Sequence, residues 1–486
     1  MKQLHDILKE VKVILQTGPE NPVIKSLCFD SRQVDRGSAF FAVPGTITDG
    51  HRYIDVALEA GAIAVICERI PEDTAEHVSY VQVEDSASAL GMAASSFFSH
   101  PSRKLKVIGI TGTNGKTTVA TLLYNLFTEA GQICGLLSTV RNLIGNTENL
   151  ASHTTPDSLQ INQLLDEMAE AGCRYCFMEV SSHAIHQKRI AGIEFAGGIF
   201  TNLSHEHLDY HKTFKNYILA KKAFFDELPA GVFALVNRDD KNGSVMVQNC
   251  KASKSRYGLA GPAEMKGKVL ESHMDGMKMV IGDREIWTRL VGRFNASNLL
   301  AVYGCALLCG MQQEEVLTIL SRQAPVRGRF ESLHSDEGVT AIIDYAHTPD
   351  ALKNVLSTIA EVRKGKAGLI TVVGAGGNRD TAKRPVMGQV AAEFSTKLIL
   401  TSDNPRDEKP EEIIDQMMEG ISKEKKKKVL SIPDRKQAIK TAIMMASAGD
   451  IILVAGKGHE TYQEIEGKRY HFDDREILLE LMKSTE

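Results

Sequence analysis

Residues 107–118 read VIGITGTNGKTT, and this stretch constrains the fold more than any other part of the chain. Its first residues are mostly β-branched, which is typical of a buried strand, and the residues after Lys116 have the apolar spacing of a helix. A glycine-rich loop joins the two. Free backbone N–H groups and the positive helix end both face an anion in such a loop. The stretch therefore predicts a phosphate-binding site in an α/β domain.

Two side chains of this loop have expected roles. Lys116 would reach the terminal phosphates of a nucleotide, and the Thr117 hydroxyl would hold Mg²⁺. The strict pattern of such loops has glycine where this chain has Ile110. The alternative, a glycine-rich turn that binds nothing, is disfavoured by the Lys-Thr-Thr run and by the flanking strand and helix.

The length of 486 residues predicts about three domains. The composition, 43% hydrophobic and 24% charged, is that of a globular protein with a sizeable core. A net charge of −4 gives no basic field for nucleic acid or an anionic membrane. The first ten residues suggest a charged amphipathic helix and not a signal peptide, and no apolar run is long enough to span a membrane. We expect a cytoplasmic monomer with reduced cysteines; Cys173 and Cys176 form a single C-x-x-C pair, which disfavours zinc.

Predicted strands alternate with helices along the chain, so we expect mostly parallel sheets with ligands at the carboxyl ends of the strands. Three domains are predicted: a small α/β domain, a central domain built on the phosphate loop, and a Rossmann-like domain, over residues 1–100, 101–330 and 331–486. In the second we expect a helix over 159–171 and strands over 175–180, 197–202 and 232–237. In the third we expect strands over 341–344, 369–373, 397–401 and 450–455.

Several polar residues follow the predicted strands of the central domain. Glu179 ends one beside the phosphate loop and could bind Mg²⁺ directly or through water; the alternative is a surface carboxylate. An H-x-H-x-D-x-H run follows another, made of His205, His207, Asp209 and His211. It could be a dinuclear metal hydrolase site or a set of ordinary loop histidines. The nucleotide loop upstream favours a third possibility, in which one histidine helps to bind a Mg²⁺ that bridges phosphates.

Lys221 and Lys222 lie side by side on a predicted helix. Such a pair is usually on a solvated helix face. Burial near other cations can instead lower the pKa of a lysine enough for it to add CO₂ and become an anionic carbamate.

The predicted C-terminal domain carries two arginines on neighbouring loops. Arg379 and Arg406 suit carboxylate recognition, because a guanidinium group binds a carboxylate through two parallel hydrogen bonds; two solvated arginines are the alternative. Residues 374–377 resemble a dinucleotide loop but lack the full G-x-G-x-x-G pattern, so we do not expect NAD.

Together, these motifs resemble the Mur ligases over essentially the whole chain. The resemblance implies a central P-loop ATPase domain, with ATP contacts from Gly112, Thr113, Asn114, Gly115, Lys116, Thr117, Thr118, Asn295, Arg329, Asp344 and His347. It implies catalytic roles for Lys116, Glu179, His207 and Lys221. It also implies Mg²⁺ held by Thr117, Glu179, His207 and Lys221, the last as a carbamate.

The resemblance extends to members that add meso-2,6-diaminopimelate. It implies contacts to a UDP-N-acetylmuramoyl-dipeptide from Phe29, Ser31, His153, Thr154, Thr155, Ser181, Gln187 and Arg189. It implies diaminopimelate contacts from Arg379, Asp403, Asn404, Pro405, Arg406, Gly456 and Glu460. Two departures are His153, where many members have asparagine, and Glu206, where an aspartate commonly precedes the histidine.

The activity implied by the resemblance is an ATP-dependent ligation. ATP would phosphorylate the γ-carboxylate of a D-glutamyl residue, and a diaminopimelate amine would attack the acyl phosphate to form an amide. One rival is a nucleotide-dependent switch that binds ATP without ligating. Another is a folylpolyglutamate-type ligase, which would not need the run from Asp403 to Arg406.

Overall fold

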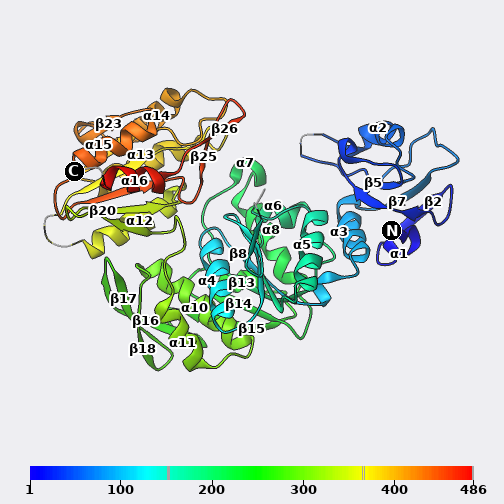
Figure 1. Ribbon diagram of the computed structural model, residues 1–486, viewed down its shortest axis with the longest axis horizontal. Helices are drawn as coiled ribbons and strands as arrows, with labels where there is room; N and C mark the ends of the chain where they lie inside the picture. Colours follow the sequence, from blue (N-terminus) through cyan, green and yellow to red (C-terminus); the bar gives the residue numbers. More distant parts are fainter. Residues whose placement is uncertain (47, 150–153, 364, 366, 484–486) are drawn as a thin grey trace.

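The computed structural model describes residues 1–46, 48–149, 154–363, 365 and 367–483. In this part of the chain three main sheets form, of five, eleven and six strands, together with two short two-stranded sheets. They follow one another along the chain, with the N-terminal part (blue) at one end of the molecule and the C-terminal part (yellow to red) at the other (Figure 1). The predicted α/β class is confirmed.

The N-terminal sheet has the strand order β2-β7-β6-β5-β4, parallel except for β2. Its elements, with the short β1–β3 pair, are β1 (Lys2–Gln3), α1 (Leu4–Ile7), β2 (Val13–Thr17), β3 (Val23–Ile24), β4 (Ser26–Cys28), β5 (Ser38–Phe41), α2 (Ile54–Glu59), β6 (Ala64–Cys67), β7 (Ser79–Val83) and α3 (Ser86–Phe97). The predicted N-terminal helix is wrong beyond the one turn of α1, because Lys2 and Gln3 pair with β3 instead.

The central sheet has the order β11-β10-β9-β12-β8-β13-β14-β15-β16-β17-β18. Its strands and helices are β8 (Lys106–Thr111), α4 (Lys116–Glu129), β9 (Cys134–Leu137), β10 (Asn142–Ile144), β11 (Thr147–Asn149), α5 (Ser158–Glu170), β12 (Tyr175–Glu179), α6 (Ser182–His186), β13 (Phe195–Phe200), α7 (Leu208–His211), α8 (Phe214–Asp226), β14 (Phe233–Asn237), α9 (Gly243–Met246), β15 (Ser253–Gly258), β16 (Met265–His273), β17 (Gly276–Ile281), β18 (Arg284–Thr288), α10 (Arg293–Leu308) and α11 (Gln313–Arg322). Strands β9, β12, β8, β13, β14 and β15 are parallel. The antiparallel β16–β18 meander was not predicted.

The C-terminal sheet has the order β19-β20-β24-β21-β22-β23, parallel except for β19. Its elements, with a separate β25–β26 hairpin, are β19 (Glu331–His334), β20 (Thr340–Asp344), α12 (Pro349–Val362), β21 (Leu369–Val373), α13 (Lys383–Phe394), β22 (Lys397–Leu400), α14 (Pro410–Glu419), β23 (Val429–Ser431), α15 (Arg435–Met444), β24 (Ile451–Ala455), β25 (Tyr462–Ile465), β26 (Lys468–His471) and α16 (Asp474–Lys483). The four predicted strands of this region are confirmed as β20, β21, β22 and β24.

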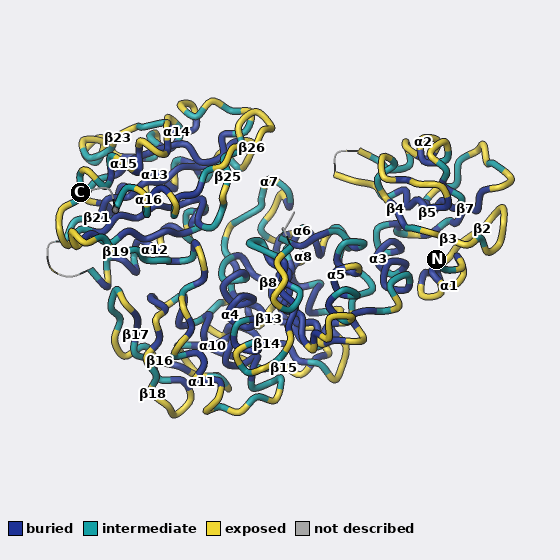
Figure 2. Tube along the Cα trace, viewed as in Figure 1, coloured by how far each residue is buried: buried dark blue, intermediate teal, exposed yellow. Residues whose placement is uncertain are grey.

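Alternate residues of the buried strands pack on opposite faces of each sheet. In β8, Ile108 and Ile110 join the cluster formed with α4, α10 and α11, whereas Val107 joins the cluster formed with α5 and α8. A strand covered on both faces explains the nearly continuous apolar sequence seen there. Figure 2 shows the buried segments grouped inside each part of the molecule.

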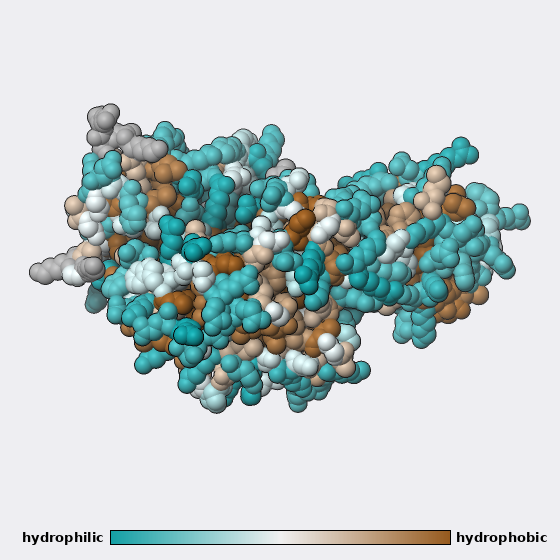
Figure 3. All heavy atoms as spheres, turned by 60° about the horizontal axis from the view of Figure 1, so that its bottom comes forward, coloured by the Kyte–Doolittle hydropathy of each residue, from teal (hydrophilic) through white to brown (hydrophobic). Residues whose placement is uncertain are grey.

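The face shown in Figure 3 is mostly hydrophilic, with hydrophobic side chains in scattered groups. Cys173 and Cys176 are both buried and carry free thiols. Across the described helices, none combines the length and the apolar character needed to cross a membrane.

Register brings the ends of the central strands to one edge. Ile110 of β8 lies beside Glu179 of β12, and Thr111 lies beside Phe200 of β13. In the C-terminal sheet, Ala455 of β24 lies between Asp344 of β20 and Val373 of β21. The loops that follow all of these strands are therefore grouped at the carboxyl edges of the two sheets.

Candidate active site

One large cleft, of about 590 Å³, lies between these two edges. One wall contains the phosphate loop, Glu179 and residues 205–209. The facing wall contains Arg329 and residues from the loops after β20, β21, β22 and β24. Polar side chains predicted from distant parts of the sequence therefore meet in one cleft, as expected at the carboxyl ends of parallel strands.

The phosphate loop is shaped by its packing against α10. Gly115 has a φ of 87°, and a Cβ atom there would lie 2.5 Å from Asn298 Oδ1, so glycine is required. Asn298 in turn donates to Asn295 Oδ1 at 3.2 Å. Asn295 was expected on the nucleotide side, but it is buried behind the loop and does not line the cleft. The loop residues that line the cleft are Thr113, Asn114, Gly115, Lys116 and Thr117, while Gly112 and Thr118 are buried.

Lys116 and Thr117 lie at the start of α4, facing the cleft. The Lys116 ammonium donates to the carbonyl oxygens of Gly112, at 3.0 Å, and Thr113, at 2.8 Å. The Thr117 hydroxyl accepts a hydrogen bond from Arg329 Nη2 at 3.0 Å, which joins the phosphate loop to the segment leading into the C-terminal sheet.

Lys221 and Lys222 are neighbours on α8 with different surroundings. Lys221 is 1% exposed, and its Nζ donates to Gly112 O at 2.9 Å, directly behind the phosphate loop. Burial, with the Lys116 charge nearby, lowers the pKa of Lys221 well below its ordinary value. Lys222 instead donates to both carboxylate oxygens of Asp226, at 2.6 and 2.7 Å. Both lysines are buried, so the solvated helix face is wrong for this pair.

Glu206 is a cleft residue that the sequence analysis did not select for the site. Its carboxylate lies 3.4 Å from His347 Nε2 on the facing wall and 3.7 Å from His207 Nε2. Burial alone would raise the pKa of Glu206, but the two histidines and Lys116 hold it well below its usual range. The only sequence signal for this residue was its position directly before His207, where the family commonly has aspartate.

The H-x-H-x-D-x-H run does not converge on one point. His205 is exposed and stacks on Phe214, with ring centroids 4.3 Å apart. His211 is buried and lies 3.0 Å from the Ser182 hydroxyl. Of the four residues of the run, His205, His207 and Asp209 line the cleft and His211 does not. Within the described residues no group of three or more histidine, cysteine or carboxylate side chains is placed to hold a metal, so the geometry gives no support to the dinuclear hydrolase alternative.

His207 itself has a strained and half-buried setting. Its φ is 55°, in the left-handed region, where a residue other than glycine is uncommon and often functional. Burial lowers the pKa of His207 to about 4, so its ring is neutral at pH 7 and keeps a lone pair.

Glu179 is fully buried at the end of β12 and lines the cleft. Its Oε1 accepts from Thr139 N at 2.8 Å and its Oε2 from Thr139 Oγ1 at 3.2 Å. The Glu179 backbone carbonyl accepts from Thr155 Oγ1 at 2.8 Å. A carboxylate held by neutral donors therefore lines the same cleft as Thr117.

The residues expected for the UDP-substrate are brought together only in part. Thr154, Thr155, Ser181, Gln187 and Arg189 gather around the end of β12 and α6, where Arg189 donates to Thr155 O at 2.9 Å and to Gln187 Oε1 at 2.6 Å. Phe29 and Ser31 follow β4 in the N-terminal part and do not line the cleft. His153 lies outside the described residues.

Two residues of the facing wall, Arg329 and His347, line the cleft as expected for the nucleotide side. Asp344 does not. Its oxygens accept from the backbone N–H groups of Phe330, at 2.7 Å, and Ala346, at 2.8 Å. Burial raises the pKa of Asp344 above its usual value. Asp344 thus fixes the backbone next to Arg329 and His347.

The residues expected to bind diaminopimelate share one end of the cleft: Arg379, Asp403, Asn404, Arg406, Gly456 and Glu460 line it, and Pro405 does not. Arg406 has a φ of 52°, and its Nη1 donates to Gly377 O at 2.7 Å. Its backbone N–H and C=O bond to Glu464 O, at 3.0 Å, and Glu466 N, at 2.8 Å. The β25–β26 hairpin, which was not predicted, therefore holds this loop in place.

Gly456 provides space for Asp403. A Cβ atom at Gly456 would lie 2.4 Å from Asp403 Oδ2, and the φ of Gly456 is 116°. Burial would raise the pKa of the Asp403 carboxyl, but Lys457 and Arg435 hold it below its usual value. The Asp403 carboxylate is therefore nearly buried, yet it lines the cleft in the space that the missing side chain of Gly456 leaves free.

Three family models match the chain in sequence order. They are "Mur ligase family, catalytic domain" over residues 23–98, "Mur ligase middle domain" over 110–306 and "Mur ligase, glutamate ligase domain" over 328–458. A curated relative from Bacteroides fragilis, named UDP-N-acetylmuramoyl-L-alanyl-D-glutamate--2,6-diaminopimelate ligase, is 54% identical over 483 residues, covering 99% of this chain and 100% of its own.

Solved structures agree with these matches. A structure titled UDP-N-acetylmuramoyl-L-alanyl-D-glutamate--2,6-diaminopimelate ligase is 32% identical, with a TM-score of 0.67 and 95% of each chain covered. A folylpolyglutamate synthase from Thermotoga maritima is 15% identical, with a TM-score of 0.59, covering 76% of this chain and 90% of that chain. The latter likeness concerns the fold alone, so fold does not separate the two kinds of ligase.

Proposed function

This chain belongs to the Mur ligase family, and we propose that it adds meso-2,6-diaminopimelate to UDP-N-acetylmuramoyl-L-alanyl-D-glutamate in peptidoglycan precursor synthesis. The observation that carries the proposal is the single cleft with the phosphate loop on one wall and the loop from Asp403 to Arg406 on the other. The relative at 54% identity bears the name of this activity. We place the enzyme in the cytoplasm, where ATP and UDP-activated precursors are found.

The reaction couples ATP cleavage to amide formation. The γ-phosphoryl group passes to the γ-carboxylate of the D-glutamyl residue, and an amine of diaminopimelate then displaces phosphate from the acyl phosphate. The products are the amide, ADP and phosphate. Positioning and charge neutralisation dominate such phosphoryl transfers. Lys116 provides a positive charge at the loop, and its ammonium would exchange two carbonyl acceptors for phosphate oxygens.

The cleft suits Mg²⁺ in its donor chemistry. The Thr117 hydroxyl and the Glu179 carboxylate are oxygen ligands of the kind Mg²⁺ prefers, and both line the cleft. The neutral ring of His207 adds a nitrogen lone pair nearby. Bound there, Mg²⁺ would neutralise phosphate charge during transfer. These three residues, with Lys221, are our proposed holders of the ion.

Lys221 is the proposed site of a carbamate. A neutral amine is needed to attack CO₂, forming an N–C bond and releasing a proton. Its burial behind the phosphate loop and its lowered pKa support this assignment over Lys222, which is paired with Asp226. The modified side chain would be an anion beside Lys116.

The amino-acid end of the cleft offers charges of both signs. Arg406 and Arg379 can receive the distal carboxylate of diaminopimelate, and Asp403 and Glu460 can receive an ammonium. Lysine lacks that distal carboxylate. Because an unpaired cation in a desolvated pocket is costly, we expect the cleft to reject lysine.

An amino-acid panel tests the proposal. The purified protein is given ATP, Mg²⁺ and the UDP-dipeptide acceptor with meso-diaminopimelate, L-lysine, L-glutamate or no amino acid, and phosphate and product mass are measured. We expect phosphate release that requires both the acceptor and diaminopimelate, with lysine used at least about 30-fold less efficiently.

Each rival has a distinct result in the same panel. Phosphate release without acceptor or amino acid would identify a nucleotide-dependent switch. Extension of a folyl acceptor by L-glutamate, with no use of the UDP-dipeptide, would identify a folylpolyglutamate-type ligase. A preference for lysine over diaminopimelate in kcat/KM would refute the substrate assignment alone.

A further inference from the structure

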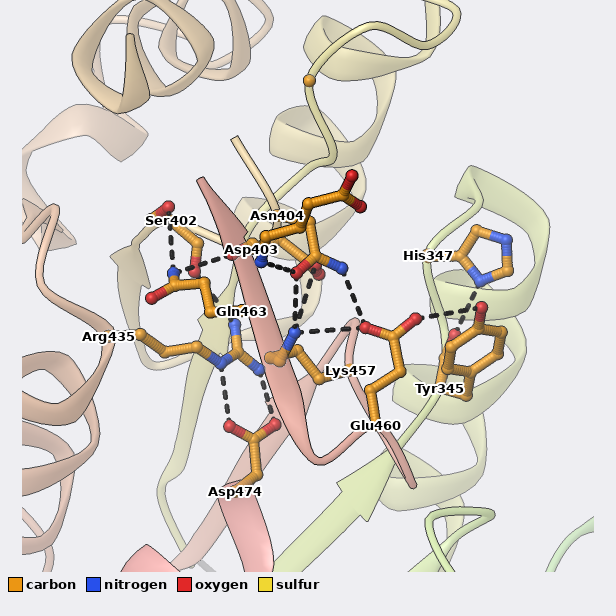
Figure 4. Close-up of polar contacts among 12 residues, drawn as sticks. Tyr345, His347, Ser402, Asp403, Asn404, Arg435, Lys457, Glu460, Gln463 and Asp474 are labelled. Atoms are coloured by element: carbon orange, nitrogen blue, oxygen red, sulfur yellow. Dashed lines mark hydrogen bonds and ion pairs between the residues drawn. The ribbon is translucent and has the colours of Figure 1, made fainter. Parts of the chain in front are cut away.

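Lys457 is a lysine of 0% exposure on the loop that follows β24, at the amino-acid end of the cleft. Its Nζ donates to Asn404 Oδ1 at 3.0 Å and to Glu460 Oε2 at 3.1 Å (Figure 4). The nearer Asp403 oxygen lies 4.0 Å away. A single buried ammonium thus contacts three of the residues proposed to receive the amino acid.

These contacts determine which way the Asn404 amide points. Its Oδ1 accepts from both Lys457 and the Glu464 backbone N–H, the latter at 3.0 Å, while its Nδ2 donates to Glu460 Oε2 at 2.8 Å. A flipped amide would turn its NH₂ group toward an ammonium and an N–H, with no acceptor between them. Glu460 Oε2 is therefore used within the protein, and Oε1, 3.4 Å from the Tyr345 hydroxyl, is the more available oxygen.

The same ammonium sets the charge of this end of the cleft. Asp403 and Glu460 supply two carboxylates, and Lys457 compensates one of them. The nearby Arg435 adds no net charge, because it forms a fully buried bidentate pair with Asp474, at 2.8 and 2.7 Å. Lys457 thus offsets part of the negative charge that Asp403 and Glu460 present to a substrate ammonium. Lys383 of α13 also lines the cleft and helps to hold the pKa of Asp403 down. Arg379 and Arg406 line the same cleft and offer cations to a carboxylate, Arg406 with Glu464 3.4 Å away.

Arg435 also makes this arrangement rigid. Its guanidinium donates to Ala455 O at 3.0 Å and to Ser402 O at 3.5 Å, which are the residues where the two pocket loops begin. Gln463 of the hairpin donates to Asp403 O at 2.7 Å (Figure 4). Lys457 therefore acts within a fixed backbone, so its removal changes polar atoms and charge more than loop position.

We propose that Lys457 is a positioning residue that sets amino-acid preference, by orienting Asn404 and Glu460 and by offsetting part of the negative charge that Asp403 and Glu460 present to the ammonium of a zwitterionic substrate end. This inference rests on the proposed function. Without Lys457 the pocket would lose one positive charge, and the Asn404 amide would keep only two of its three hydrogen bonds. Such a pocket disfavours a distal group that bears a carboxylate, as in diaminopimelate, more than one that bears an ammonium alone, as in lysine.

The test replaces the charge with an unbranched apolar side chain in Lys457→Met, with Lys457→Gln as a milder second variant. Lys468→Met, at an exposed position on the adjacent hairpin, is the matched control. Thermal unfolding and circular dichroism establish folding. Steady-state kinetics then give kcat and KM for ATP, the UDP-dipeptide and both amino acids.

We expect the KM for diaminopimelate to rise roughly 30-fold or more in Lys457→Met, since one partner of a buried charged hydrogen bond is lost. The KM values for ATP and the UDP-dipeptide should stay within about threefold of wild type. The kcat/KM ratio of diaminopimelate to lysine should fall about tenfold, and less in Lys457→Gln. A purely structural role would lower kcat for both amino acids equally and leave this ratio unchanged.

Every outcome decides the matter. An unchanged ratio in folded variants overturns the proposal, and so does a failure of both variants to fold, which would assign Lys457 to stability. A changed ratio in Lys468→Met would overturn it as well, because the effect would not be specific to the buried ammonium. If the wild type itself does not use diaminopimelate, the proposed function fails, independently of the variants.

Discussion

Replacing Lys221 by methionine should abolish ligation and, at the same time, stabilise the fold. The side chain is buried behind the phosphate loop, and its amine has no carboxylate partner among the hydrogen bonds and ion pairs recorded for the described residues. If Lys221 works as a carbamate, methionine removes an anion next to the reacting phosphates. Loss of one such electrostatic group typically lowers kcat by ~10²–10³-fold.

Two opposing terms set the stability change. The variant loses the hydrogen bond from Lys221 to Gly112 O, which is worth ~0.5–1.5 kcal/mol. That carbonyl is not left unpaired, because Lys116 also donates to it at 3.0 Å. Against this stands the cost of burying an amine, roughly 1–3 kcal/mol in protein mutational data and more for a charge. Because the cost of burying the amine exceeds the value of the lost hydrogen bond, we expect the free energy of unfolding to rise by about 1 kcal/mol in Lys221→Met. This corresponds to ~2–4 °C in Tm for a domain of this size.

The pH dependence follows from the lowered pKa of Lys221. Lysine in the unfolded chain titrates near ~10.4. Between the lowered folded value and that value, the unfolded state binds more protons, so wild-type stability rises with pH. Methionine has no proton to lose, and its advantage should therefore shrink as the pH rises from neutral toward the unfolded value.

The assay is thermal unfolding of both proteins at pH 7 and at pH 9, in CO₂-depleted buffer so that the amine is unmodified, with ligase rates measured separately in bicarbonate. Lys222→Met is the control. It loses only a partly exposed i,i+4 ion pair with Asp226, worth ~0.3–0.5 kcal/mol, and should keep its activity. Near-normal turnover of Lys221→Met would refute the catalytic role. A fall in its Tm, or an advantage that grows with pH, would refute the energetic argument.

Three further substitutions give separate tests. Lys116→Ala should abolish ADP formation while circular dichroism stays native; appreciable turnover would remove Lys116 from the phosphoryl step. Arg406→Ala should raise the KM for diaminopimelate by roughly 30-fold or more, at ~2–5 kcal/mol for a desolvated charged partner, and leave the KM for ATP nearly unchanged; an equal effect on both would contradict the assignment. Arg435→Met should destabilise the C-terminal part by ~3–5 kcal/mol in denaturant unfolding, because Asp474 is left buried and unpaired, and a loss below ~1 kcal/mol would contradict this.

The parallel core of the molecule could be predicted from sequence because its signals are local. A buried strand is a short apolar run, and it needs no knowledge of its neighbours. The predicted strands at 175–180, 232–237 and 369–373 correspond to β12, β14 and β21 within a residue or so. The β16–β18 strands, at one end of the central sheet, and the β25–β26 hairpin escaped prediction, because β16 and β25 are mostly polar and carry no continuous apolar run.

Site residues could be predicted where all the groups needed for binding are adjacent in the sequence of one loop. The phosphate loop is the clearest case, since glycines, lysine and threonine are adjacent in sequence. The H-x-H-x-D-x-H run shows the opposite situation. Regular spacing there suggested one metal site, yet α7 begins at Leu208, His205 stacks on Phe214 and His211 lies beside the Ser182 hydroxyl. Spacing alone could not indicate this, because His207 takes a left-handed backbone conformation with a φ of 55° inside the motif.

The residues that sequence reasoning missed are those whose partners lie far along the chain. The role of Glu206 depends on its contact with His347 across the cleft, and the role of Lys457 depends on its contacts with Asn404 and Glu460. Neither contact can be inferred from the sequence next to the residue. A buried charge is tolerated only when a partner compensates it, so each of these ions identifies a contact between separate loops. Glu206 and His347 join the two walls of the cleft, and Lys457 joins the loops after β22 and β24 on one wall. Both contacts follow from the topology of the sheets, which groups these loops at the carboxyl ends of their strands. We therefore expect the amino-acid preference of the enzyme to depend on these contacts as well as on the motifs that made the family recognisable.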